Sequence, residues 1–96
     1  MEILREEQAF RIRNEAKEVI AEITFPETLK DIDVWDVNHT WVDPVLRGQG
    51  IASKLVVAVD EAARAEGKRI IATCPYVIAW YKRHRDKQDI ICGQLK

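Results

Sequence analysis

Long hydrophobic runs and a surplus of charge of one sign are both missing from this sequence. No apolar stretch reaches the roughly 18 residues of a membrane span, and the opening MEILREEQ lacks the pattern of a signal peptide. The 15 basic and 16 acidic residues give a net charge of −1. Because nucleic-acid binding normally requires a strongly basic face, we expect no nucleic acid among the partners. Because no apolar stretch is long enough to span a membrane, we expect no membrane among them either.

Cysteines are also few. Cys74 and Cys92 are too far apart for a zinc CxxC knuckle, and two are too few for a disulfide framework. We therefore expect no metal and take a reducing cytoplasm as the default location. At 96 residues the chain is too short for a two-halved dinucleotide fold or a TIM barrel. Its composition, 47% hydrophobic and 32% charged, predicts one folded domain over residues 1–96.

The hydrophobic pattern changes from strand-like to helical near residue 43. Residues 7–13 and 17–25 predict an antiparallel hairpin with a turn at Asn14-Glu15. Residues 32–42 predict a third, longer strand, with Trp35, Val37, His39 and Trp41 sharing a face. After it the sequence predicts an amphipathic helix over 51–66, a buried strand over 68–73 and a helix from Pro75 to about Arg85. We expect the apolar cluster at 90–92 to pack back on the sheet. The fold class is α+β (mixed α/β), with helices on a mostly antiparallel sheet.

The most informative segment is the glycine turn Leu46-Arg47-Gly48-Gln49-Gly50-Ile51-Ala52, which lies between a strand and the long helix. Main-chain N–H groups in such a turn can converge on an anion, and the helix N-terminus adds a positive dipole end. The P-loop pattern GxxxxGK[ST] is absent, and the dinucleotide pattern GxGxxG fails at Ser53. The pattern [Q/R]xxGx[G/A] is filled by Arg47, Gly50 and Ala52.

This segment resembles the coenzyme A pyrophosphate loop of the GNAT-superfamily (GCN5-related) N-acetyltransferases. The resemblance extends over about residues 37–86: it includes His39-Thr40 and Val42 before the loop, Gly67 after the helix, and Cys74-Pro75-Tyr76-Val77 with Tyr81. Loop, strand and CPY segment in this order are similar to a small single-domain group of the superfamily. The resemblance implies a truncated GNAT-like sheet with splayed central strands.

The resemblance further implies acetyl-CoA as cosubstrate and an amine as acceptor. The residues expected to hold coenzyme A are Thr40, Trp41, Val42, Arg47, Gly48, Gln49, Gly50, Ile51, Ala52 and Ser53. The pantetheine arm would add a pseudo-strand along the edge of residues 39–42. The family often has an acidic residue where this chain has Trp41, and Asp36 and Asp43 are alternatives that the sequence does not separate.

Three residues are candidates for the chemistry. Histidine has an unperturbed pKa near 6.5, which suits His39 as the general base. The alternative is a structural histidine that is hydrogen-bonded beneath the loop. Cys74 is either a nucleophile or acid near the acetyl group or a buried small hydrophobe. Tyr81 resembles the superfamily tyrosine that protonates the leaving thiolate, its alternatives being a core tyrosine or Tyr76 as the phenol.

We therefore expect an acetyl-CoA-dependent N-acetyltransferase with an unidentified amine acceptor. An acyl-Cys74 intermediate is the mechanistic alternative. A coenzyme A-binding module with little or no catalysis, and an interaction domain with no ligand, are the rival functions. An exposed sheet edge or tail is compatible with a homo-oligomer.

Overall fold

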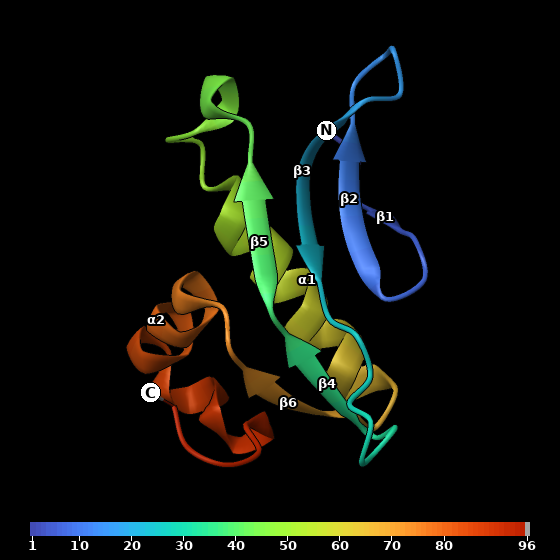
Figure 1. Cartoon of the computed structure of the whole chain (residues 1–96). Coiled ribbons are helices and arrows are strands. Elements are labelled where there is room, and N and C mark those ends of the chain that lie inside the picture. Colours follow the sequence, from blue (N-terminus) through green and yellow to red (C-terminus); the bar gives the residue numbers. More distant parts are fainter. Residues whose placement is uncertain (96) are drawn as a thin grey trace.

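A four-stranded antiparallel sheet forms one end of the protein (Figure 1). In the computed structural model, which describes residues 1–95, its strands run in the order β1 (Leu4–Arg5), β2 (Ala9–Arg13), β3 (Val19–Thr24) and β5 (His39–Val42). The predicted hairpin of β2 and β3 is confirmed. The left-handed residue of its turn is Lys17, with φ 68°, rather than Asn14, whose side chain accepts a hydrogen bond from the N–H of Glu18. The two-residue strand β1 was not predicted, since Leu4-Arg5 is too short to show alternation.

The prediction of one continuous strand over 32–42 is wrong. The chain forms β4 (Val34–Val37), pauses at Asn38 and continues as β5, and the two pieces have different partners. β4 pairs in parallel with β6 (Arg69–Ala72), whereas β5 pairs with β3. The Val37 carbonyl accepts the N–H groups of Thr73 and Cys74. Beyond this point β5 and the chain that follows β6 diverge (Figure 1). The central strands are therefore splayed.

The pause at Asn38 also reverses the face of the sheet on which the side chains after it lie. Trp35 and Val37 are buried in the core, as strict alternation predicts, but Val42 is buried with them, while His39 is exposed. One extra residue shifts a period-two pattern by one position. The expected common face for Trp35, Val37, His39 and Trp41 is therefore wrong: His39 lies opposite Thr24, and Trp41 opposite Glu22, on the other side of the sheet.

Helices cover one face of the sheet. α1 (Ile51–Ala65) runs behind it, and α2 (Pro75–Arg83) lies beside β6, as Figure 1 shows. Short 3₁₀ segments, η1 (Pro44–Leu46) and η2 (Arg85–Ile90), precede α1 and follow α2. The predicted helices and the strand over 68–73 are confirmed with small shifts at their ends. Within residues 1–95, no helix combines the length and the apolar character that crossing a membrane requires.

The core lies between the sheet and the two helices. Leu55, Val56 and Val59 of α1 are buried against Ile23 of β3 and Ile70 of β6. The C-terminal cluster packs along β6, because Ile91 bridges to Ile70 and the N–H of Cys92 donates to the Ile70 carbonyl at 2.7 Å. The predicted return of residues 90–92 to the sheet is confirmed.

Candidate functional site

The turn before α1 is shaped by one side-chain hydrogen bond and two glycines with left-handed backbone. The Asp43 carboxylate accepts the N–H of Val45 at 3.0 Å and starts η1. Gly48 and Gly50 then take left-handed conformations, with φ 84° and 72°. Residues that carry a side chain rarely adopt such backbone angles, so these two positions favour glycine. Gly50 is the N-cap residue directly before α1, and it has no side chain with which to cap the helix.

The N–H groups at this helix start have no protein partner. Within residues 1–95, no acceptor is found for the main-chain N–H groups of 48–53, and the first helical bond runs from Lys54 to the Gly50 carbonyl at 3.2 Å. These donors stand at the positive end of the helix dipole, where an anion is favoured. A cavity of about 210 Å³ opens at this turn, lined by Val42, Leu46, Arg47, Gly48, Gly50, Ile51, Ala52 and Tyr76.

A second cavity continues the first along β5. It measures about 280 Å³ and is lined by Thr40, Trp41, Val42, Arg47, Ala52 and Tyr76, four of which also line the first cavity. We call the two together the groove. β5 is the last strand of its sheet, so its outer edge is free where it diverges from β6. The Arg47 Nε donates to the Val42 carbonyl at 3.3 Å, which places a cation beside both cavities.

The expected coenzyme A residues are gathered at this groove with two differences. Thr40, Trp41, Val42, Arg47, Gly48, Gly50, Ile51 and Ala52 line it. Gln49 belongs to the same turn without lining either cavity, and the Ser53 hydroxyl faces the other way, accepting a hydrogen bond from Trp80 Nε1 at 3.0 Å. Leu46 lines the groove and was not anticipated, because a leucine outside any periodic pattern carries no chemical signal.

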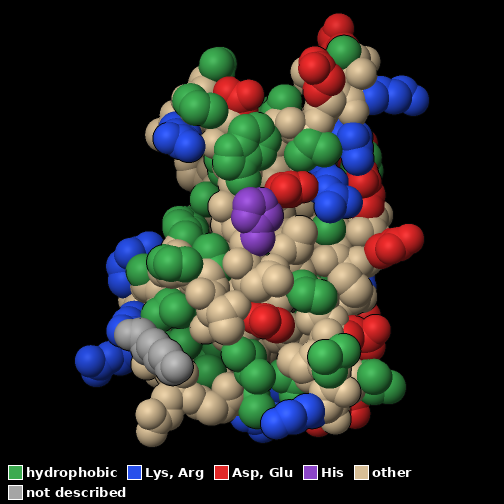
Figure 2. Space-filling model, viewed as in Figure 1, with side chains coloured by type: hydrophobic (Ala, Val, Ile, Leu, Met, Phe, Trp, Pro, Cys, Tyr) green, Lys and Arg blue, Asp and Glu red, His purple; other side chains and the backbone are tan. Residues whose placement is uncertain are grey.

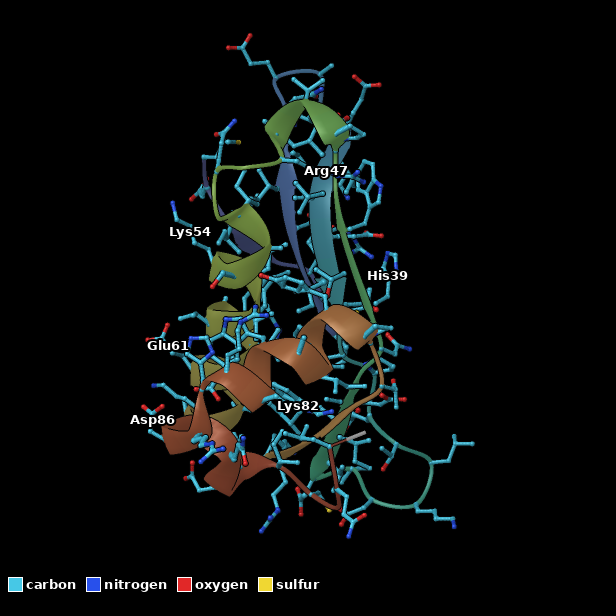
Figure 3. All side chains as sticks on the ribbon, turned by 90° about the vertical axis from the view of Figure 1, so that its left-hand side faces the viewer. His39, Arg47, Lys54, Glu61, Lys82 and Asp86 are labelled. Carbon is cyan, nitrogen blue, oxygen red and sulfur yellow. The ribbon has the colours of Figure 1, made fainter. Side chains whose placement is uncertain are left out.

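His39 projects from the sheet on the side away from both helices, as Figure 3 shows. Its Nε2 lies 3.0 Å from Glu22 Oε2 on β3. Glu22 in turn accepts from Arg11 Nε at 2.8 Å. The Arg11 guanidinium, with a smaller contribution from His39, lowers the pKa of the Glu22 carboxyl. Glu22 was missed at the sequence level, because its contact with His39 depends on the register between β3 and β5.

Cys74 lies at the splay, directly before α2. Its side chain is buried, and its Sγ donates to Thr40 Oγ1 at 3.6 Å. Its carbonyl accepts the N–H of Ile78, so the residue also begins α2. The structure therefore brings Cys74 next to the strand that lines the groove, with its thiol bonded to a neighbouring hydroxyl.

Tyr81 is not brought to the groove. Its ring is fully buried between α1 and α2, and its hydroxyl donates to Asp60 Oδ1 at 2.8 Å. Burial, followed by the bond to Asp60, raises the pKa of Tyr81 far above its usual range. Tyr76, five residues earlier on α2, lines both cavities and is the phenol that the groove contains. Within residues 1–95, no group of three or more His, Cys, Asp or Glu could hold a metal ion.

Comparison with known proteins identifies the class. The sequence profile described as GCN5-related N-acetyl-transferase matches residues 9–90. The chain belongs to this family, and its antiparallel sheet, the splayed parallel pair of β4 and β6, and the helices form the family's α+β fold. No curated protein sequence matches the chain.

Solved structures are similar over different shares of their length. A GCN5-like protein from Staphylococcus aureus is 33% identical with a TM-score of 0.76, covering 97% of this chain and 89% of that protein. A GNAT-family protein of the same species is 27% identical (TM-score 0.53, 65% and 51%). An acetyltransferase-like protein from Agrobacterium tumefaciens is 28% identical (TM-score 0.60, 79% and 56%). The chain thus spans only about half the length of the latter two.

Proposed function

We propose that this chain is an acetyl-CoA-dependent N-acetyltransferase that transfers the acetyl group to an amine. The observation that carries the proposal is the row of unpartnered main-chain N–H groups at 48–53, at the start of α1 and beside a cavity of about 210 Å³. A helix start left without protein caps is a ready site for a diphosphate. Membership of the GCN5-related family supports coenzyme A as the bearer of that diphosphate.

The groove suits the remainder of coenzyme A. Backbone N–H groups between Arg47 and Ala52 would bind the pyrophosphate, and the Arg47 side chain adds positive charge beside them. The free edge of β5 offers main-chain groups to the amides of the pantetheine arm, which would lie there like an added strand. The thioester would then reach the splay near Cys74 and Thr40.

The chemistry requires one base and one acid. The lone pair of the neutral amine forms the new C–N bond at the thioester carbonyl, and His39, directly or through one water, takes the amine proton as the C–S bond breaks. The leaving thiolate receives a proton from the Tyr76 hydroxyl, since Tyr76 lines the groove whereas Tyr81 is bonded to Asp60. Holding both substrates in place supplies several kcal/mol of the barrier by itself.

Binding is tested by titration calorimetry with coenzyme A on a matched pair of variants. Gly50 and Gly67 both have φ near +70°, and a Cβ at either meets no heavy atom within 4 Å. Alanine therefore strains both positions alike, by about 1–2 kcal/mol, but only Gly50 lies at the groove. We expect Gly50→Ala to weaken binding by about tenfold or more and Gly67→Ala to leave it unchanged. Equal effects of the two variants would contradict the proposed site.

Turnover is tested separately with acetyl-CoA and a mixed panel of amines. Acetylation of at least one amine, with loss of turnover in His39→Gln, is the expected result. Binding of coenzyme A without any acetylation would instead make the chain a coenzyme A-binding module. No binding at millimolar coenzyme A would leave an interaction domain without this ligand.

A further inference from the structure

The exposed face of the sheet carries a chain of acidic and basic groups that ends at His39. Figure 2 shows basic and acidic side chains next to a histidine on this face. The contacts run from Arg13 to Glu6, from Glu6 to Arg11, from Arg11 to Glu22 and from Glu22 to His39. We propose that Glu22 is the positioning residue that fixes the tautomer of His39, making Nδ1 the atom that takes the amine proton. The inference rests on the proposed function, because it assigns Glu22 a role through its base.

The geometry determines which nitrogen carries the proton. Glu22 Oε2 lies 3.0 Å from His39 Nε2, and an ionised carboxylate only accepts hydrogen bonds. The neutral imidazole must therefore carry its proton on Nε2 and keep its lone pair on Nδ1. Within residues 1–95 no hydrogen-bond partner of Nδ1 is found, and 48% of the His39 side chain is exposed. Nδ1 is thus the nitrogen available to an incoming amine.

Arg11 makes the arrangement rigid. It donates its Nε to Glu22 Oε1 at 2.8 Å and a second guanidinium nitrogen to Glu6 at 3.3 Å. Glu6 is itself held by two nitrogens of Arg13, at 2.8 and 2.9 Å. Arg11 thereby keeps Glu22 charged and leaves Oε2 facing β5. Within residues 1–95, no other charged side chain makes a hydrogen bond or an ion pair with His39.

The same anchor predicts what an amide does at position 22. Arginine has donors only, so in Glu22→Gln the amide oxygen must stay toward Arg11. The amide NH₂ then faces His39 Nε2 and donates to it. Nε2 can accept only with its lone pair free, so the proton moves to Nδ1 and the base loses its accessible lone pair. An amide in place of an orienting carboxylate has this effect on a catalytic histidine.

Nitrogen-15 NMR of the imidazoles reads the tautomer directly at alkaline pH, where histidine is neutral. In the wild type we expect His39 as the Nε2–H form, and in Glu22→Gln as the Nδ1–H form. His84 is an internal reference, because its Nδ1 bonds the Trp80 carbonyl at 2.6 Å far from this contact. The control Glu15→Gln removes the same charge from the β2–β3 turn and should leave both histidines unchanged. An unchanged His39 pattern in Glu22→Gln would overturn the inference.

Kinetics provides the second readout. Glu22→Gln should lower kcat by about 10²-fold, the range for general-base catalysis, with KM for acetyl-CoA unchanged. In a His39→Gln background the same substitution should cause no further loss, since Glu22 acts only through His39. Additive losses would overturn the inference and leave the proposed function standing. A wild type that acetylates nothing removes the proposed function and the base role, whereas the NMR result still decides the tautomer.

Discussion

The two tyrosines of α2 have opposite surroundings although they lie five positions apart. Tyr81 is fully buried with its hydroxyl on Asp60, while Tyr76 is half-buried and lines the groove. Asp60 is itself only 2% exposed, and its Oδ2 accepts a hydrogen bond from Arg64 Nε at 2.9 Å. A carboxylate so deeply buried needs every partner that it has. Tyr81 is therefore a stabilising residue and Tyr76 a candidate for proton transfer.

Phenylalanine at each position separates these roles. Tyr81→Phe removes one donor from buried Asp60 and should lower the free energy of unfolding by about 1–2 kcal/mol, with kcat unchanged. Tyr76→Phe should lower kcat by about 10-fold or more and change stability by less than about 0.5 kcal/mol. Urea denaturation and steady-state kinetics measure the two effects. A loss of turnover in Tyr81→Phe at unchanged stability would return the proton-donor role to Tyr81.

The thiol of Cys74 is expected to take no acetyl group. Its hydrogen is directed to Thr40 Oγ1 and its side chain is buried, which favours direct transfer to the amine over an acyl-enzyme. Mass spectrometry of the protein mixed with acetyl-CoA but no acceptor should show no acetyl adduct, and Cys74→Ala should keep turnover within a few fold. Cys92→Ala is the control for the second thiol. An adduct that disappears only in Cys74→Ala would establish the covalent route.

At the scale of elements, η2 is attached to α1 by one arginine. Arg64 contacts Asp60 on its own helix, both carboxylate oxygens of Asp89, and the carbonyl of Lys87. Its side chain is only 35% exposed. Because Ile90, the last residue of η2, and Ile91, which follows it, are both part of the core, these contacts of Arg64 also position the C-terminal cluster.

Removing these contacts of Arg64 should loosen η2 before the rest of the molecule. In Arg64→Ala we expect faster amide hydrogen exchange over residues 85–91, with the sheet residues of β2 and β3 unchanged, since local opening follows local contacts. Arg83→Ala removes an exposed cation from α2 and is the matched control. Uniformly faster exchange throughout the chain would show instead that Arg64 supports global stability alone.

At the scale of the whole molecule, the helices cover one face of the sheet and the opposite face carries an ion-pair network. Arg13, ahead of the weaker contribution of Arg11, lowers the pKa of Glu6 from its usual 4.5 to about 2. A carboxyl whose pKa is lower in the folded chain stabilises it above the unfolded pKa, and this contribution is lost as pH falls through the folded pKa. The relevant window therefore lies between about pH 4.5 and 2.

Acid should weaken the wild type more than a variant that lacks this carboxylate. The melting temperature of the wild type should exceed that of Glu6→Gln at pH 6, and the difference should shrink as pH falls from about 4.5 toward 2. High salt should also reduce the difference, because the network is solvent-accessible. A constant difference across this pH range would show that Glu6 acts through contacts other than its charge.

Local patterns in the sequence were sufficient for the two helices, the β2–β3 hairpin and the glycine turn, but not for β1 or for the division between β4 and β5. The helical period over 51–65, the glycines at 48, 50 and 67, and the alternation of β2 and β3 all express short-range preferences. The glycine turn over residues 46–52 was predictable for the same reason, since it occupies a few consecutive residues.

Tertiary structure decided everything that depends on strand partners. Asn38 interrupts the central strand because β4 and β5 pair with different neighbours, and this interruption moved His39 to the open face. The contact of Glu22 with His39 joins residues 17 positions apart. Tyr81 is buried beside Asp60 and therefore does not line the groove. A single sequence encodes local periodicity strongly, but strand register and burial arise only when distant segments meet. The start of α1 could therefore be predicted, whereas the side chains that surround His39, Cys74 and Tyr81 could not.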